Sequence, residues 1–86
     1  MKVTTTKKFD KQFKKQAPKI QKEFALRITL FLNDIYNPIL NTHKLSGKLK
    51  DLWSFNVTGD IRVIFDKSFP DMVLLEAIGS HSELYK

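Results

Sequence analysis

The sequence contains no cysteine and only three glycines and three prolines in 86 residues. Without cysteine the chain can form neither disulfides nor thiolate metal sites, so packing alone has to stabilise it. The low glycine and proline content, together with 42% hydrophobic residues, predicts an ordered globular protein. A chain of this length builds one thin core. We therefore expect a single domain over residues 1–86.

Long apolar runs are also missing. No stretch approaches the roughly 18 residues that cross a bilayer, and the first ten residues, MKVTTTKKFD, lack the apolar segment of a signal peptide. The sequence therefore predicts a cytoplasmic protein without membrane contact. It has no glycine-rich phosphate loop, and its two histidines lack the further histidine or spaced carboxylates that would complete a metal site. We expect no metal and no small-molecule cofactor.

Acidic residues are few compared with basic ones. Nine Asp and Glu oppose fifteen Lys and Arg, which gives a net charge of +6. Residues 1–23 hold eight lysines and two acidic residues, so this segment carries the whole excess of positive charge. A second basic block, HKLSGKLK, spans residues 43–50. Two basic surfaces predict a polyanionic partner, either nucleic acid or an acidic protein segment. A solvated helix face would explain the N-terminal lysines equally well.

The first half of the chain has helical periodicity. A short β-branched strand is expected over residues 2–5, and Thr5 or Thr6 can then cap a helix. Pro18 suits the first turn of a second helix, because its missing N–H would be unpaired there anyway, and Asn37-Pro38 should end that helix. The residues that define the two apolar stripes are Phe9, Phe13 and Ala17, then Ile20, Phe24, Ile28, Phe31 and Ile35, with Leu26, Leu30 and Leu32 widening the second.

From residue 52 onward, hydrophobic and polar residues alternate. The segments LWSFNV and IRVIFD each predict a strand, and Thr58-Gly59-Asp60 between them predicts a hairpin turn. The apolar run MVLLEAI indicates a central strand. The resulting order, β-α-α-β-β-β, predicts an α+β fold in which a helical hairpin packs on one face of a small antiparallel sheet. The other face should stay open, as a place for a ligand.

Arg62 is expected on this open face. Successive side chains of a strand point to opposite faces, and the apolar residues on either side of Arg62 are expected to face the core. A guanidinium among apolar residues needs a carboxylate or a phosphate beside it. A salt bridge to Asp60, Asp66 or Glu76 would meet that need without any function.

Two histidines and a tyrosine add acid–base chemistry. His81 follows the last strand, Tyr85 lies four residues on, and His43 lies in the basic block. An imidazole can exchange a proton near neutral pH, although either histidine could be an ordinary surface residue. Together with Arg62, these side chains fit cleavage of RNA through its own 2′-hydroxyl. That reaction needs a base, an acid for the leaving 5′-oxygen, and cations on the phosphorane.

Three segments, HKLSG, LWSFNVTGDIRVIF and IGSHSELY, resemble the RelE/ParE superfamily of bacterial toxins, most closely its YafQ and YoeB branches of mRNA interferases. The resemblance covers essentially the whole chain. It implies the toxin of a type II toxin–antitoxin module, a metal-independent endoribonuclease that cuts mRNA in the 30S ribosomal A site. It also implies a cognate antitoxin protein as partner, which we expect to dock by charge on residues 1–23 and 43–50.

The resemblance further implies a role for each matching residue. His81 matches the C-terminal catalytic histidine, with the role of general acid, and Tyr85 matches a functional aromatic residue. Arg62 matches the arginine on the scissile phosphate, and His43 matches both a YafQ histidine and the YoeB glutamate proposed as base. The residues expected to contact RNA are Lys44, Lys48 and Lys50 of the basic block and Asp60, which matches an acidic residue of the YafQ site.

Two positions depart from the YafQ pattern. Asn56 stands where YafQ has a further histidine, and Ile61 replaces a tryptophan. Two other functions therefore stay open: a ParE-like inhibitor of DNA gyrase, and a degenerate toxin fold that only binds partners. The pairing of His81 with Tyr85 argues against the gyrase inhibitor.

Overall fold

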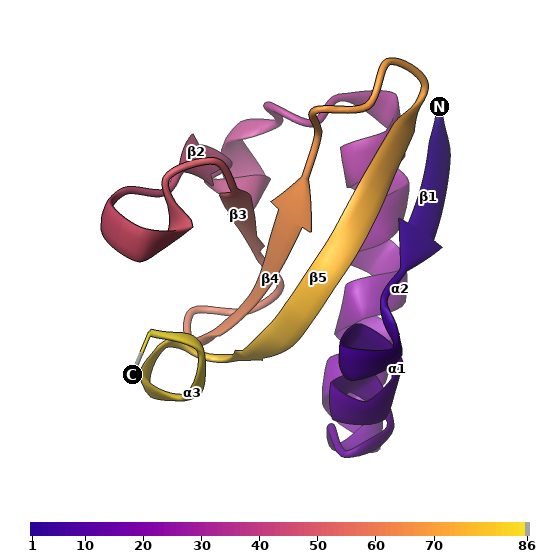
Figure 1. The fold of residues 1–86 in the computed structure, drawn as a ribbon. Coiled ribbons are helices and arrows are strands. Elements are labelled where there is room, and N and C mark those ends of the chain that lie inside the picture. Colours follow the sequence, from indigo (N-terminus) through magenta and orange to yellow (C-terminus); the bar gives the residue numbers. More distant parts are fainter. Residues whose placement is uncertain (86) are drawn as a thin grey trace.

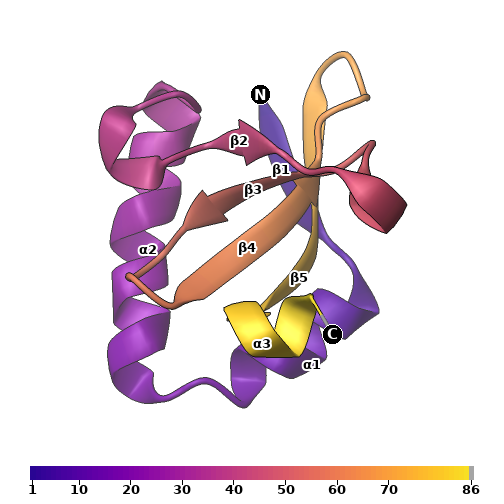
Figure 2. The ribbon, with the colours of Figure 1, turned by 90° about the vertical axis from the view of Figure 1, so that its left-hand side faces the viewer.

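The computed structural model describes residues 1–85 as a mixed five-stranded sheet with two long helices on one face and a short helix on the other (Figures 1 and 2). The α+β class and the order of the long elements are confirmed. The elements in chain order are β1 (Lys2–Thr5), α1 (Lys7–Lys14), α2 (Pro18–Asn33), the 3-10 turn η1 (Pro38–Leu40), β2 (His43–Lys44), a second 3-10 turn η2 (Gly47–Leu49), β3 (Trp53–Asn56), β4 (Ile61–Asp66), β5 (Met72–Ser80) and α3 (His81–Leu84).

The strands lie in the order β1-β5-β4-β3-β2. Strands β2 to β5 pair in antiparallel fashion, as their short connections require. The expectation of an entirely antiparallel sheet is wrong for β1, which runs parallel to β5, with Lys2 opposite Met72. The two helices between β1 and the rest of the sheet supply the long connection that a parallel neighbour needs.

The core lies between the sheet and α2, and aromatic rings fill it. Phe31 of α2 is fully buried between Phe55 of β3 and Phe65 of β4, with ring centroids 4.8 and 5.0 Å away. Near α1, Phe9, Phe13 and Phe24 form a second ring cluster. Offset and edge-on ring pairs of this kind add to the burial of apolar area. Together the two clusters fix α1 and α2 on the sheet.

The apolar stripe of α2 is narrower than its sequence suggests. Leu26 and Leu32 are 62% and 47% exposed, so the expectation that they widen the buried stripe is wrong. Ala17 is also exposed, because it caps α2 rather than continuing α1. The helix ends at Asn33, four residues before Asn37-Pro38, because the next residue takes an extended backbone. None of the helices in residues 1–85 is long and apolar enough to span a bilayer.

The sheet face opposite α2, which we call the outer face, is partly covered. We expected an open face, but Ser54, Ile64 and Ala77 on it are at most 4% exposed. The segment after β2 and helix α3 cover them, and Leu49 and Leu84 line one recess together with Ile64 and Ala77. Ile64 is a large apolar side chain on this face. Covering it stabilises the fold, because burial of apolar surface is favourable in free energy.

Thr6 links α1 to the irregular part of β5. Its hydroxyl oxygen accepts a hydrogen bond from the Phe9 backbone N–H at 3.0 Å and thereby caps α1. The same hydroxyl donates to the Glu76 carbonyl at 3.0 Å, and the Thr6 backbone N–H donates to the Leu75 carbonyl. Glu76 lies where the pairing of β5 with β4 shifts by one residue, a β-bulge. The side chain of Thr6 therefore supplies a hydrogen-bond partner both to a backbone N–H in the first turn of α1 and to a backbone carbonyl at the bulge.

Replacement of Thr6 by Ala should lower the free energy of unfolding by about 1–2 kcal/mol, because the cap and the bond to Glu76 are lost together. Thr29→Ala is the matched control, since that hydroxyl only bonds back to the Ala25 carbonyl within α2. Urea unfolding followed by circular dichroism measures both variants. Equal midpoints for Thr6→Ala and wild type would contradict this account of the bulge.

Candidate active site

Two rows of residues cross the outer face. Directly opposite residues on paired strands point to the same face. Arg62 of β4 lies between Asn56 of β3 and Gly79 of β5. The next row runs from His43 of β2 through Ser54 and Ile64 to Ala77. The register therefore places Arg62 and His43 on the same face of the sheet.

The bulge decides what lies beside Arg62. Phe65 pairs with Leu75, whereas Ile64 pairs with Ala77, so the alternation of β5 changes phase at Glu76. Ile78 consequently faces the core, and buried Gly79 faces outward next to Arg62. A Cβ at position 79 would lie 3.1 Å from the Glu83 carboxylate. The missing side chain of Gly79 thus gives α3 the space to pack against β5.

Helix α3 fixes the position of His81. Ser80 is its N-cap, and a capping box joins Ser80 to Glu83: the Ser80 N–H donates to the Glu83 carboxylate at 2.8 Å, and the Glu83 N–H donates to the Ser80 hydroxyl at 3.2 Å. His81 is therefore the first residue of α3. The ring of Tyr85, one turn later, lies 4.6 Å from the His81 ring between centroids.

These elements enclose a small recess of about 210 Å³, which we call the histidine recess. It brings together the four residues expected to be catalytic, from three parts of the chain: β2, β4 and the segment that contains α3. Its lining consists of His43, Leu45, Ser46, Leu49, Arg62, His81 and Tyr85.

Buried polar atoms without a hydrogen-bond partner concentrate around this recess. Within residues 1–85 they are Ser54 Oγ, Asn56 Oδ1, Arg62 Nε and Tyr85 Oη, all on the outer face or directly after α3. Arg62 also forms no ion pair in this part of the chain, so the alternative of a salt bridge to Asp60, Asp66 or Glu76 is wrong. Buried polar groups normally have partners. Arg62 and Tyr85 line the recess itself, and their unpaired atoms suit a polar ligand there.

The hydrogen bond of His43 determines which ring nitrogen is available. Nδ1 lies 2.8 Å from the Asn41 carbonyl oxygen, which can only accept, so Nδ1 carries the hydrogen. Asn41 has a φ of 49°, in the left-handed region that asparagine tolerates, and this turns its carbonyl toward the ring. In the neutral imidazole, Nε2 is then the unprotonated nitrogen that can accept a proton.

The four residues expected to contact RNA are not all at the recess. Lys48 lines an adjoining recess of about 290 Å³ together with Ser46 and Tyr85. Lys44 and Lys50 are exposed and line neither recess, and Asp60 is exposed in the turn before β4. In residues 1–85, no group of three or more His, Asp or Glu side chains is placed to hold a metal ion.

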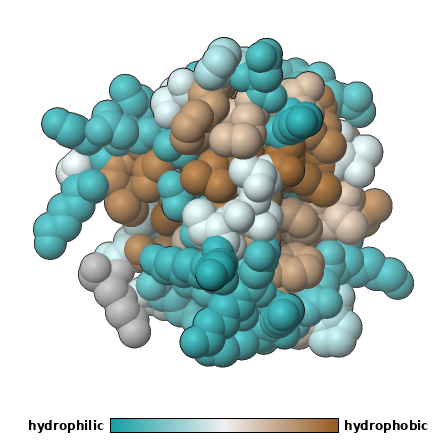
Figure 3. Space-filling model, turned by 45° about the vertical axis from the view of Figure 1, so that its right-hand side comes forward, coloured by the Kyte–Doolittle hydropathy of each residue, from teal (hydrophilic) through white to brown (hydrophobic). Residues whose placement is uncertain are grey.

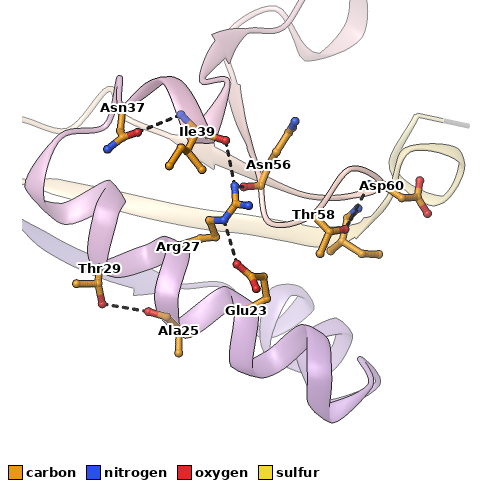
Figure 4. Close-up of polar contacts among 10 residues, drawn as sticks. Glu23, Ala25, Arg27, Thr29, Asn37, Ile39, Asn56, Thr58 and Asp60 are labelled. Atoms are coloured by element: carbon orange, nitrogen blue, oxygen red, sulfur yellow. Dashed lines mark hydrogen bonds and ion pairs between the residues drawn. The ribbon is translucent and has the colours of Figure 1, made fainter.

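Sequence reasoning missed Arg27, which holds the end of β3 from the helix side (Figure 4). Its Nη1 donates to the carbonyls of Ile39, at 3.0 Å, and Asn56, at 3.3 Å, while Nε pairs with Glu23 at 3.2 Å. Asn56 is the neighbour of Arg62 in the sheet. The only sequence signal for this contact was the Glu23–Arg27 spacing of four residues, which predicts their ion pair but not its link to β3.

A family model described as the bacterial toxin of a type II toxin–antitoxin system, YafQ, matches residues 1–86. No curated protein sequence matches the chain. Among solved structures, YafQ from E. coli strain BL21(DE3) is similar, with a TM-score of 0.77 and 18% identity over 98% of this chain and 97% of that one.

Two further solved structures have the same fold. The E. coli DinJ-YafQ complex gives a TM-score of 0.76 and 18% identity over 98% of this chain and 97% of that one. A metal-bound toxin from Helicobacter pylori gives a TM-score of 0.73 and 27% identity, and 99% of each chain is covered. The resemblance found in the sequence is thus confirmed: this chain belongs to the YafQ family of bacterial toxins of type II toxin–antitoxin systems.

Proposed function

We propose that this toxin is an endoribonuclease that cuts messenger RNA. The observation that supports this most directly is the histidine recess, which combines two imidazoles with Arg62, a half-buried cation that has no carboxylate partner in residues 1–85. A cation of this kind suits a phosphate, which a guanidinium binds through two parallel hydrogen bonds. Two imidazoles beside a phosphate can supply the general base and the general acid that RNA cleavage uses.

In this mechanism the 2′-hydroxyl of the RNA is the nucleophile. His43 Nε2 takes the hydroxyl proton, and the 2′-oxygen forms a bond to phosphorus. The bond from phosphorus to the 5′-oxygen then breaks, and His81 donates a proton to that oxygen. Arg62 stabilises the charge that grows on the other phosphate oxygens. The products are a 2′,3′-cyclic phosphate and a 5′-hydroxyl, and Tyr85 keeps the His81 ring in place.

The substrate we propose is mRNA in the ribosomal A site, in the cytoplasm, as the family implies. The recess is small and borders open surface, so it can hold a phosphate but not a long stretch of RNA. An enzyme with so few contacts gains from a second body that holds the strand in line. The ribosome would supply that alignment.

We also propose a cognate antitoxin as protein partner. YafQ of E. coli forms a toxin–antitoxin complex with DinJ. In this chain the lysines of residues 1–23 are exposed, and Figure 3 shows hydrophilic side chains gathered over the lower part of the molecule, where α1 lies. Such a surface attracts an acidic protein segment.

His81→Gln should reduce mRNA cleavage in cells by roughly 10²–10⁴-fold, because the leaving oxygen then lacks its acid. Mapping of mRNA 5′ ends after induction measures this, and wild-type ends should carry 5′-hydroxyls. Ser82→Gln, the exposed neighbour on α3, is the matched control and should cut normally. Ends with 5′-phosphates would refute the mechanism. If wild type and His81→Gln instead arrest growth equally and neither produces cuts, the result would indicate gyrase inhibition.

The double reversal Lys11→Glu with Lys15→Glu should weaken antitoxin binding at least tenfold and flatten its dependence on salt, because two exposed positive charges become negative. Calorimetry at several salt concentrations measures both quantities. The double variant with Gln at the same positions separates loss of attraction from new repulsion and should fall between the two. If affinity and salt dependence stay at wild-type values, the antitoxin does not dock on α1.

A further inference from the structure

A second recess adjoins the histidine recess. We call it the side recess, and its volume is about 290 Å³. Ser46, Leu49 and Tyr85 line both recesses, so the two share a wall. The side recess adds Leu84 from α3 and Lys48 from η2. Neither histidine nor Arg62 lines it.

The walls of the side recess are suited to a flat, partly apolar group. Leu49 and Leu84 contribute apolar surface, and Tyr85 contributes an aromatic ring. The hydroxyl of Tyr85 is buried without a hydrogen-bond partner in residues 1–85, and it belongs to the shared wall. Small-molecule sites typically combine such apolar lining with a few polar groups. Here the polar groups are Ser46 at the shared wall and Lys48 in the side recess.

The covalent structure of RNA connects the two recesses. A ribose and its base are attached on each side of every phosphate. If the scissile phosphate lies at Arg62, a base next to it can reach a recess that shares a wall with the phosphate site. Bases of single-stranded nucleic acids stack readily on aromatic side chains. The side recess therefore offers a place for one of the two bases that flank the cut.

We propose that the side recess is a subsite for a nucleobase next to the scissile phosphate, and that Lys48 selects for guanine or uracil there. This inference rests on the proposed nuclease function. Among residues 1–85, Lys48 is the only charged residue that lines the side recess, and an ammonium group can only donate hydrogen bonds. Guanine and uracil present a carbonyl oxygen where adenine and cytosine present an amino group, and lysine contacts to guanine carbonyl oxygens are common.

Reversal of the charge at position 48 gives the sharpest test. A carboxylate accepts hydrogen bonds, so Lys48→Glu should favour adenine and cytosine at the same position. We expect the ratio of guanine plus uracil to adenine plus cytosine next to the cuts to fall at least fivefold. Lys48→Gln, which both donates and accepts, should abolish the discrimination. Lys48 is exposed, so these variants should fold normally.

Sequencing of mRNA 5′ ends after induction in cells measures the base frequencies on both sides of every cut. Because the readout is a ratio among cuts, a slower variant still reports it. Lys19→Glu on α2 is the control for charge alone, and its base ratio should equal that of wild type. Leu84→Phe, which narrows the side recess without a charge change, should alter the frequencies at the same position.

The outcomes separate the two proposals. If wild type cuts and Lys48→Glu cuts with the same base ratio on both sides, the subsite proposal is wrong and the nuclease proposal stands. If wild type makes no cuts, the nuclease proposal fails and the subsite fails with it. If the Lys48 variants keep the wild-type ratio but lose antitoxin affinity, the side recess is a protein-binding site.

Discussion

The register between β4 and β5 is the constraint on which the rest of the site depends. Arg62 lies opposite Gly79 only because β5 contains one extra residue at Glu76. If β5 continued from the Phe65–Leu75 pair without this bulge, Ile78 would lie opposite Arg62 and face outward, and α3 would have no glycine to pack against. The bulge is held from the side by α1: Thr6 donates to the Glu76 carbonyl, and the Gln12 side chain accepts from the Ile78 N–H at 3.0 Å. Bulges often reposition side chains near functional sites in this way.

The strands of the site are therefore positioned by α1 and α2, neither of which lines the recess. Helix α1 fixes the free edge of β5, while Arg27 of α2 fixes the end of β3 through the Asn56 carbonyl. Arg62 lies between these two supports, on the strand that neither helix bonds directly. The lining side chains come from β2, the segment after β2, β4, α3 and the residue after α3. The backbone register of the sheet therefore sets the positions of the side chains that line the recess.

Much of this fold could be predicted from sequence because its signals are local. Alternation around Arg62 and the helical spacing of Phe24, Ile28 and Phe31 depend only on neighbouring residues. The bulge, the parallel pairing of β1 and the two-residue strand that carries His43 could not, because each depends on a partner far along the chain. The catalytic roles proposed for His43, Arg62, His81 and Tyr85 came from family resemblance. The unpaired atoms of Ser54 and Asn56 became visible only when the strands were placed side by side.

The pairing of β1 with β5 has a consequence for the order of folding. Lys2 and Met72 are neighbours in the sheet although 70 positions separate them in sequence. Contacts of such separation form late, because a large loop must close before they give any stabilisation. During synthesis, β5 and His81 emerge from the ribosome among the last residues of the domain. A nascent chain thus cannot assemble the histidine recess until His81 and Tyr85 have left the ribosome.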